Sequence, residues 1–171
     1  SQFRGSLEVF FDSSGEPRKA GTKLIQLDLA KTLTGIQALG SKYFYRGPTG
    51  MLISQWMEQN GGILTMRDFR RYQAVSRVPV TSTYRGYTVV GFPPPSSGGV
   101  HVAQMLNILE HYDLASIYKQ SPIDFQHVVT ESMKLAFADR AYWLGDPAYA
   151  KVPLGLVSKE YAKGLSTQID L

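Results

Sequence analysis

The chain is 171 residues long, with 43% hydrophobic and 19% charged residues, a balance that excludes an intrinsically disordered protein. Its 18 basic and 14 acidic residues leave a mild net charge of +4, too scattered along the chain to indicate a nucleic-acid-binding surface. The absence of cysteine excludes disulfides and thiolate metal sites, and no apolar run reaches the ~20 residues of a membrane span.

The N-terminal third is predicted to begin with a strand and continue with a helix. Apolar residues 9–11 run into the turn-forming residues 12–15, a pattern typical of a strand followed by a turn. Asp28 is suited to cap the next helix, which Gly40 ends. Its apolar stripe recurs at helical spacing and consists of Leu29, Leu33, Ile36 and Leu39.

Two further helices are expected before residue 75. Pro48 suits the first turn of one helix, and residues 60–62 end it. Thr65 and Asp68 form a capping box for a short helix. The buried face of the Pro48 helix is predicted to consist of Leu52, Ile53, Trp56 and Met57. The aromatic residues at 43–45 favour core packing over a ligand platform.

Residues 79–92 are predicted to form a β-hairpin. Alternating apolar and polar residues flank a turn at Arg85 and Gly86, which is typical of two paired strands. Because proline cannot donate a ladder hydrogen bond, the prolines at 93–95 must end the second strand.

Three helices are expected in the remaining sequence. The first follows a cap at Ser96 or Ser97, the longest starts at the Ser121–Asp124 capping box, and Ser158 caps the last. The predicted inward residues of the first are Val102, Met105, Leu106, Leu109 and Tyr112. Those of the longest helix, which is ended by residues 145–147, are Phe125, Val128, Val129, Ser132, Leu135 and Ala136. Those of the last are Tyr161, Leu165 and Ile169.

The resulting fold class is α-rich α+β, with about six helices, one β-hairpin and a lone edge strand. The sequence shows no internal repeat. We expect residues 1–171 to form a single partial domain without a separate linker, cut from inside a longer protein.

The motif that most resembles a catalytic site is the segment 96–101. Ser97 and His101 lie four residues apart at a helix start, so a hydroxyl nucleophile and a general base could meet there. However, the segment lacks the glycine pattern of a nucleophile elbow. A helix cap followed by glycines that allow close backbone approach is favoured. Anion binding on the free N–H groups of this turn is the alternative.

The remaining polar residues favour structural roles. His101, His111 and His127 lack the spacing of a metal-binding helix motif, and Glu131 and Asp139 are explained by ion pairing on a helix surface. The densest basic cluster is interpreted as solvated surface and consists of Arg67, Arg70, Arg71 and Arg77. Spacing alone therefore indicates only an α-rich domain.

Several segments in one register resemble the bacterial γ-glutamyltranspeptidase family. The most specific is the run of residues 93–101, and residues 104–110 extend it. A second group comprises residues 138–140 and 144–147, and residues 151–153, 161–163 and 168–170 continue the match. Upstream, residues 28–30, 32–33, 44–45, 61–62 and 84–87 also fit. The resemblance covers nearly the whole chain.

This resemblance implies the C-terminal part of the large subunit of an N-terminal-nucleophile hydrolase with a four-layer αββα fold. The implied enzyme is a γ-glutamyltransferase and glutathione hydrolase that cuts itself into a large and a small subunit. The new N-terminal threonine of the small subunit is its nucleophile. Its partners are that catalytic subunit, glutathione and other γ-glutamyl compounds, and its location is periplasmic or secreted.

The family's threonine lies beyond the region that this sequence matches, and so does its carboxylate-binding arginine. We therefore assign no catalytic, substrate-binding or metal-binding residue and no cofactor, and we expect the chain alone to be inactive. Two alternatives stay open, which are an acylase acting on a different amide and a non-catalytic helical scaffold. Helices that normally cover a sheet would leave apolar stripes bare, so self-association of the chain is also expected.

Overall fold

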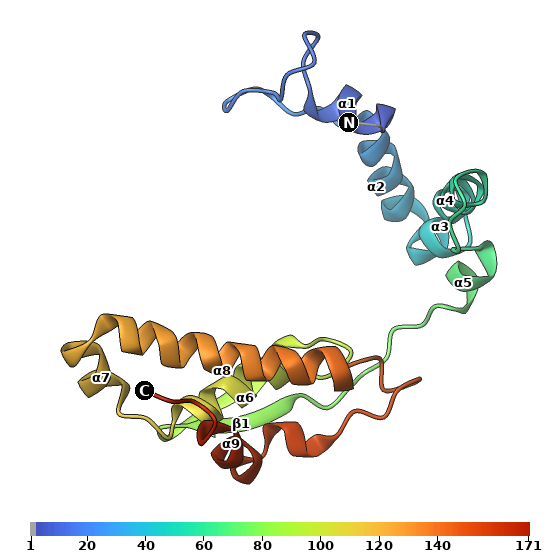
Figure 1. Ribbon diagram of the computed structural model, residues 1–171. Helices are drawn as coiled ribbons and strands as arrows, with labels where there is room; N and C mark the ends of the chain where they lie inside the picture. Colours follow the sequence, from blue (N-terminus) through green and yellow to red (C-terminus); the bar gives the residue numbers. More distant parts are fainter. Residues whose placement is uncertain (1–2) are drawn as a thin grey trace. The chain divides into compact units, whose positions relative to one another are not determined.

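The computed structural model describes residues 3–171, and the chain divides into two compact units, Ser1–Ala74 and Val75–Leu171. The first unit is helical (Figure 1). Its helices are α1 (Arg4–Phe10), α2 (Leu27–Leu39), α3 (Ser41–Tyr45), α4 (Pro48–Gln59) and α5 (Met66–Arg71).

The strand predicted at residues 9–11 is wrong, because residues up to Phe10 belong to α1. Phe11 forms only an isolated bridge with Pro17, so this apolar run has no partner strand to pair with. A strand needs such a partner, whereas a helix satisfies its backbone within the segment. An Arg4–Glu8 pair at 2.8 Å adds a contact along the same helix.

Most of the predicted helix signals of the first unit are confirmed. Asp28 is the exception, because it lies inside the first turn of α2, and the N-cap position belongs to Gln26. Gly40 follows the last residue of α2, Pro48 is the first residue of α4, and the Thr65–Asp68 capping box opens α5 with both of its reciprocal bonds. The sequence analysis did not predict the short α3, which carries the aromatic residues.

Burial in the first unit differs from the prediction for α4. Leu52 is 67% exposed and Trp56 is 49% exposed, while Ile53 and Met57 are half-buried. Among the described residues of this unit only Gly50 is buried. The aromatic residues at 43–45 do pack against other rings, since Phe44 contacts Phe69 at 6.0 Å between ring centroids, but they are half-buried and form no buried core. The apolar side of α4 is therefore largely bare within this chain.

The second unit is built around α6 (Gly98–Leu109). A β-hairpin packs against this helix, and so do the long α8, the C-terminal α9 and a 3₁₀ turn, η1 (Figure 1). The bounds are β1 (Val80–Tyr84), β2 (Tyr87–Gly91), α7 (Leu114–Gln120), α8 (Pro122–Trp143), η1 (Leu154–Val157) and α9 (Lys159–Ser166).

The hairpin is confirmed, with β1 and β2 antiparallel and Tyr84 opposite Tyr87. Its two-residue turn places Arg85 at φ 49° and Gly86 at φ 87°. Two positive φ values give the turn whose twist matches that of paired strands.

The predicted caps and buried face of the later helices are largely confirmed. Ser121 accepts the Asp124 N–H at 3.2 Å, and Ser158 accepts the Tyr161 N–H at 3.1 Å. On α8, the residues Val128, Ser132 and Ala136 are buried.

Three details differ from the prediction. Val102 is 44% exposed, because the buried face of α6 is rotated towards its polar residues. Ile169 is buried but lies beyond the end of α9. The helix α7 was missed although Asp113 caps it. With the short helices included, the described residues form more helices than the six expected. The strands of the described residues are the two that form the hairpin.

Candidate functional site

The most specific sequence motif, residues 93–99, connects β2 to α6 through a close contact between two backbones. A Cβ added to Gly99 would lie 2.3 Å from the carbonyl oxygen of Phe92, and one added to Gly91 would lie 2.5 Å from the Cα of Gly99. Only glycine fits at such distances. The close backbone approach predicted for the glycines after the cap is therefore confirmed for Gly99, but not for Gly98, whose added Cβ would have open space.

The structure does not assemble Ser97 and His101 into a nucleophile–base pair. The His101 ring binds the carbonyl oxygen of Ser97, with Nδ1 at 2.5 Å, rather than the hydroxyl. At the helix start the Ser96 hydroxyl accepts the Gly98 N–H at 3.3 Å, so the capping side chain is Ser96. A structural turn is the interpretation that this geometry supports, and anion binding there stays a prediction.

Below the turn, α6 buries a row of polar side chains. His101 is 4% exposed, and Gln104 and Asn107 are 0% exposed. Asn107 accepts the Ser82 hydroxyl at 3.0 Å and donates to the Val157 carbonyl at 2.8 Å. A single amide therefore ties α6 to both the hairpin and η1, which satisfies buried polar groups that would otherwise be costly.

Gln104 extends the same row towards α8 and α9. Its amide donates to Asp139 at 2.5 Å, and the Tyr161 hydroxyl donates to the same carboxylate at 2.8 Å. Burial and the Asp139 hydrogen bond raise the pKa of Tyr161 to about 12. Tyr161 also lines a cavity of about 720 Å³ together with Trp143, Leu156 and Leu165. The chain of polar contacts from Gln104 therefore reaches a cavity that these apolar side chains help to line.

A second polar cluster joins the hairpin turn to the last helix. Glu110 accepts the Arg85 N–H at 2.6 Å, and Lys159 contacts Glu110 and the Thr83 carbonyl at 2.5 Å each. The Arg85 hydrogen bond and then Lys159 hold the pKa of Glu110 below its usual value. We call the side chains of Glu110 and Lys159, together with the backbone groups of Thr83 and Arg85 that they bind, the hairpin clasp.

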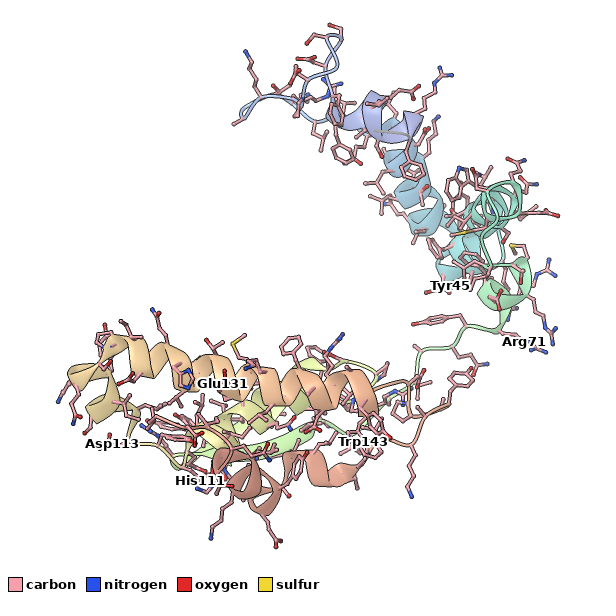
Figure 2. The ribbon with its side chains drawn as sticks, viewed as in Figure 1. Tyr45, Arg71, His111, Asp113, Glu131 and Trp143 are labelled. Atoms are coloured by element: carbon pink, nitrogen blue, oxygen red, sulfur yellow. The ribbon has the colours of Figure 1, made fainter. Side chains whose placement is uncertain are left out.

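The other polar residues considered from the sequence remain apart. Figure 2 shows His111 and Glu131 on separate parts of the second unit. Glu131 pairs with Lys134 at 2.7 Å, and His127 binds the Asp170 carbonyl at 2.9 Å. Within residues 3–171 no group of His, Asp and Glu could hold a metal ion, and no helix is long and apolar enough to cross a bilayer.

The basic cluster does not act as one group. Arg77 in the second unit forms an ion pair with Asp146 at 3.0 Å. Arg67, Arg70 and Arg71 are exposed on α5, where Figure 2 labels Arg71. Solvated surface is therefore supported for the three arginines of α5, and Arg77 has a structural partner.

Sequence reasoning missed the buried row on α6 and the hairpin clasp. The only signal for the row was the spacing of His101, Gln104 and Asn107 at three-residue steps, which places them along one helix face. Nothing in the sequence marks Glu110 and Lys159 as partners, because 49 residues separate them.

Comparison with known proteins decides the family. The sequence model described as Gamma-glutamyltranspeptidase matches residues 1–171. The chain belongs to the γ-glutamyltranspeptidase family.

Individual relatives agree with this family. The glutathione hydrolase proenzyme of Escherichia coli (strain K12) is 44% identical over 165 residues, which are 96% of this chain and 28% of that protein. The acylase ACY 1 proenzyme of Pseudomonas sp. (strain V22) is 45% identical over 149 residues, or 86% of this chain and 26% of that protein. The chain thus spans less than a third of the length of these relatives.

A solved structure confirms the fold. The crystal structure of Helicobacter pylori gamma-glutamyltranspeptidase superposes with a TM-score of 0.84 and 39% identity, covering 99% of this chain and 48% of that one. The chain therefore shares the N-terminal-nucleophile hydrolase fold of γ-glutamyltranspeptidases, to which it contributes helices and one hairpin.

Proposed function

We propose that this chain is a structural part of a γ-glutamyltransferase and glutathione hydrolase. The whole enzyme would transfer γ-glutamyl groups from glutathione to water, amino acids or peptides. The observation that carries this proposal is the 44% identity to a glutathione hydrolase proenzyme along 96% of the chain.

In this proposal the chain belongs to the large subunit, and the nucleophile is a threonine further along the precursor. Self-cleavage would expose that threonine as the first residue of a small subunit, where its own α-amine can act as the base. Backbone N–H groups of that subunit would stabilise the oxyanion. The expected location is periplasmic or secreted.

The role proposed for the chain itself is to support the catalytic region. Its buried polar row and its glycine contact hold α6 against the hairpin and α8, which favours a rigid wall over a reacting group. We also propose that the two compact units belong to one domain of the complete enzyme, and that the chain alone is inactive.

The test uses the full-length parent protein. The masses and N-terminal residues of all chains in the purified product are measured, followed by hydrolysis of a γ-glutamyl anilide. The proposal expects two chains, the second beginning with threonine, and release of the aniline. One intact chain that lacks such a threonine would instead support a scaffold without chemistry.

The similarity to acylase ACY 1, at 45% identity over 149 residues, favours a second candidate, an acylase for another amide. Both enzymes would split their precursor, so processing cannot separate them. The same purified protein is therefore compared on a γ-glutamyl anilide and on a cephalosporin with an amide-linked acyl side chain. Preference for the cephalosporin by kcat/KM would replace the first proposal with the second.

A further inference from the structure

Two buried polar atoms on α6 have no protein partner among the described residues. They are Nε2 of His101 and Oε1 of Gln104. The two residues are 4% and 0% exposed, so neither atom meets bulk solvent. Leaving a buried acceptor unpaired costs about 1–3 kcal/mol per group, and two such atoms three residues apart on one helix call for an explanation.

The hydrogen bonds at the other ends of these side chains define both atoms as acceptors. Nδ1 of His101 faces the carbonyl oxygen of Ser97 at 2.5 Å, which selects the tautomer with the hydrogen on Nδ1 and the acceptor lone pair on Nε2. The Gln104 NH₂ group donates to Asp139, which leaves Oε1 as the carbonyl end. A bridging group must therefore donate two hydrogens.

The two atoms also lie on the same side of α6, towards α8. The His101 ring contacts the Phe137 ring at 5.8 Å between centroids, and Gln104 binds Asp139. Side chains three residues apart on a helix have Cβ atoms about 5–6 Å apart. Residues at this spacing lie side by side on the helix, so one water at about 2.8–3.0 Å from each acceptor can contact both side chains.

We propose that one water molecule is buried between α6 and α8, where it donates one hydrogen to His101 Nε2 and the other to Gln104 Oε1. Water has the two donors that this pair of acceptors requires. Buried waters typically satisfy polar groups of this kind and are costly to remove. This inference does not depend on the reaction that the enzyme catalyses.

The water completes a continuous hydrogen-bonded path across the second unit. The path runs from the Ser97 carbonyl through His101, the water, Gln104 and Asp139 to the Tyr161 hydroxyl at the wall of the 720 Å³ cavity. It would connect the start of α6, where the glycine contact lies, to α8 and α9. His101 and Gln104 are then positioning residues that act through a shared solvent molecule.

The direct test is a high-resolution crystal structure of the full-length parent. The expected result is a solvent peak within about 3.2 Å of both atoms. Direct contact of Nε2 with Oε1 would overturn the proposal, because no solvent molecule would then lie between the two atoms. An empty space between them, or two different protein partners, would overturn it equally.

Two variants test the bridge in solution. His101→Asn keeps a donor for the Ser97 carbonyl and removes Nε2, and Gln104→Met keeps the side-chain length and removes the amide. If a water couples the two residues, the double variant loses less Tm than the sum of the single losses. Additive losses would contradict the bridge.

Val102→Ala is the matched control, because Val102 lies on the exposed side of the same helix. It should shift Tm little and combine additively with either variant. Should a variant fail to fold, the crystal structure of the unmodified protein still decides between the outcomes above.

Discussion

Gly99 illustrates how a single residue sets the packing of this protein. Its missing side chain allows α6 to start directly against the end of β2, at a distance where any Cβ would overlap the Phe92 carbonyl. Gly98, its neighbour, has open space instead, since its nearest contact would be the Ser96 hydroxyl at 3.6 Å. The close backbone contact therefore requires a glycine at position 99 but not at position 98.

Gly99→Ala is expected to destabilise the fold by about 2 kcal/mol or more, because the backbone on both sides must move to admit the methyl group. Gly98→Ala is the control and should change stability by less than about 1 kcal/mol, in the stabilising direction if it reduces unfolded-state freedom. Thermal or urea unfolding of the two variants measures the difference. Equal effects would show that the close contact does not matter.

Asn107 is the second residue whose identity follows from its contacts. Replacing it with leucine leaves the Ser82 hydroxyl and the Val157 carbonyl without this partner. We expect a loss of about 1–3 kcal/mol for each group left buried and unpaired. Ser82→Ala removes only the first bond and should cost clearly less in the same unfolding experiment. A neutral Asn107→Leu would mean that water replaces the lost partner.

Between elements, the hairpin clasp joins segments that local sequence cannot link. Glu110 at the end of α6 holds the backbone of the β1–β2 turn, and Lys159 brings in the start of α9. The clasp therefore fixes two sides of α6 at once, while Asp139 fixes a third through Gln104 and Tyr161.

Glu110→Gln is predicted to reduce the acid sensitivity of folding. The folded-state pKa of Glu110 lies below the reference value of 4.5, so its contribution is present above that pH and is lost as pH falls through the folded pKa. Its side chain is partly exposed, and we expect about 1 kcal/mol or less. We expect urea unfolding between neutral pH and about pH 3 to show that the free energy of unfolding falls less steeply with acid in the variant than in the unmodified protein. The exposed Glu58→Gln serves as control and should keep the original slope.

Tyr161 provides the corresponding prediction at alkaline pH. Its pKa is raised from 10.0 to about 12, first by burial and then by the Asp139 hydrogen bond. The neutral hydroxyl is favoured in the fold, so its contribution is present below about pH 10 and is lost as pH rises towards 12. Asp139→Asn should move this tyrosine's pKa back towards 10.0. An absorbance titration measures this pKa, and Tyr161→Phe identifies which ionisation at high pH belongs to Tyr161. If Asp139→Asn leaves that ionisation unchanged, the coupling between the two residues is contradicted.

At the scale of the whole chain, the main feature is apolar surface that the contacts within each unit do not cover. On α2 the predicted stripe is bare, with Leu29 at 48%, Leu33 at 56% and Leu39 at 64% exposure. Apolar surface gathered on one helix face usually marks an interaction site. Since the chain spans 28% of the E. coli relative, the rest of such a protein is a natural candidate to cover it.

The isolated chain, residues 1–171, is therefore expected to self-associate. Light scattering across a concentration series should show a mass that rises above that of one chain. Leu33→Lys, at the middle of the bare stripe, should reduce the association, whereas Lys31→Gln on the same helix should not. A monomer throughout the series would contradict the expectation.

The sequence by itself determined the features that depend on a few neighbouring residues. The capping box at Thr65, the caps at Ser121 and Ser158, and the turn at Arg85 and Gly86 all act over one to four positions. The local residue types therefore suffice to predict them. The ordered motifs around residues 93–101 also indicated the family.

The tertiary structure decided which faces are buried and which polar groups meet. Val102 was expected inside and lies outside, because the position of α6 depends on Ser82, Asp139 and Val157, which are 25, 35 and 50 residues from their partners in the chain. The strand expected at residues 9–11 is absent because the run has no partner strand. Its first two residues end α1, and Phe11 forms only an isolated bridge with Pro17. Burial and pairing are set by what packs alongside a segment, and its own residues cannot specify that neighbour.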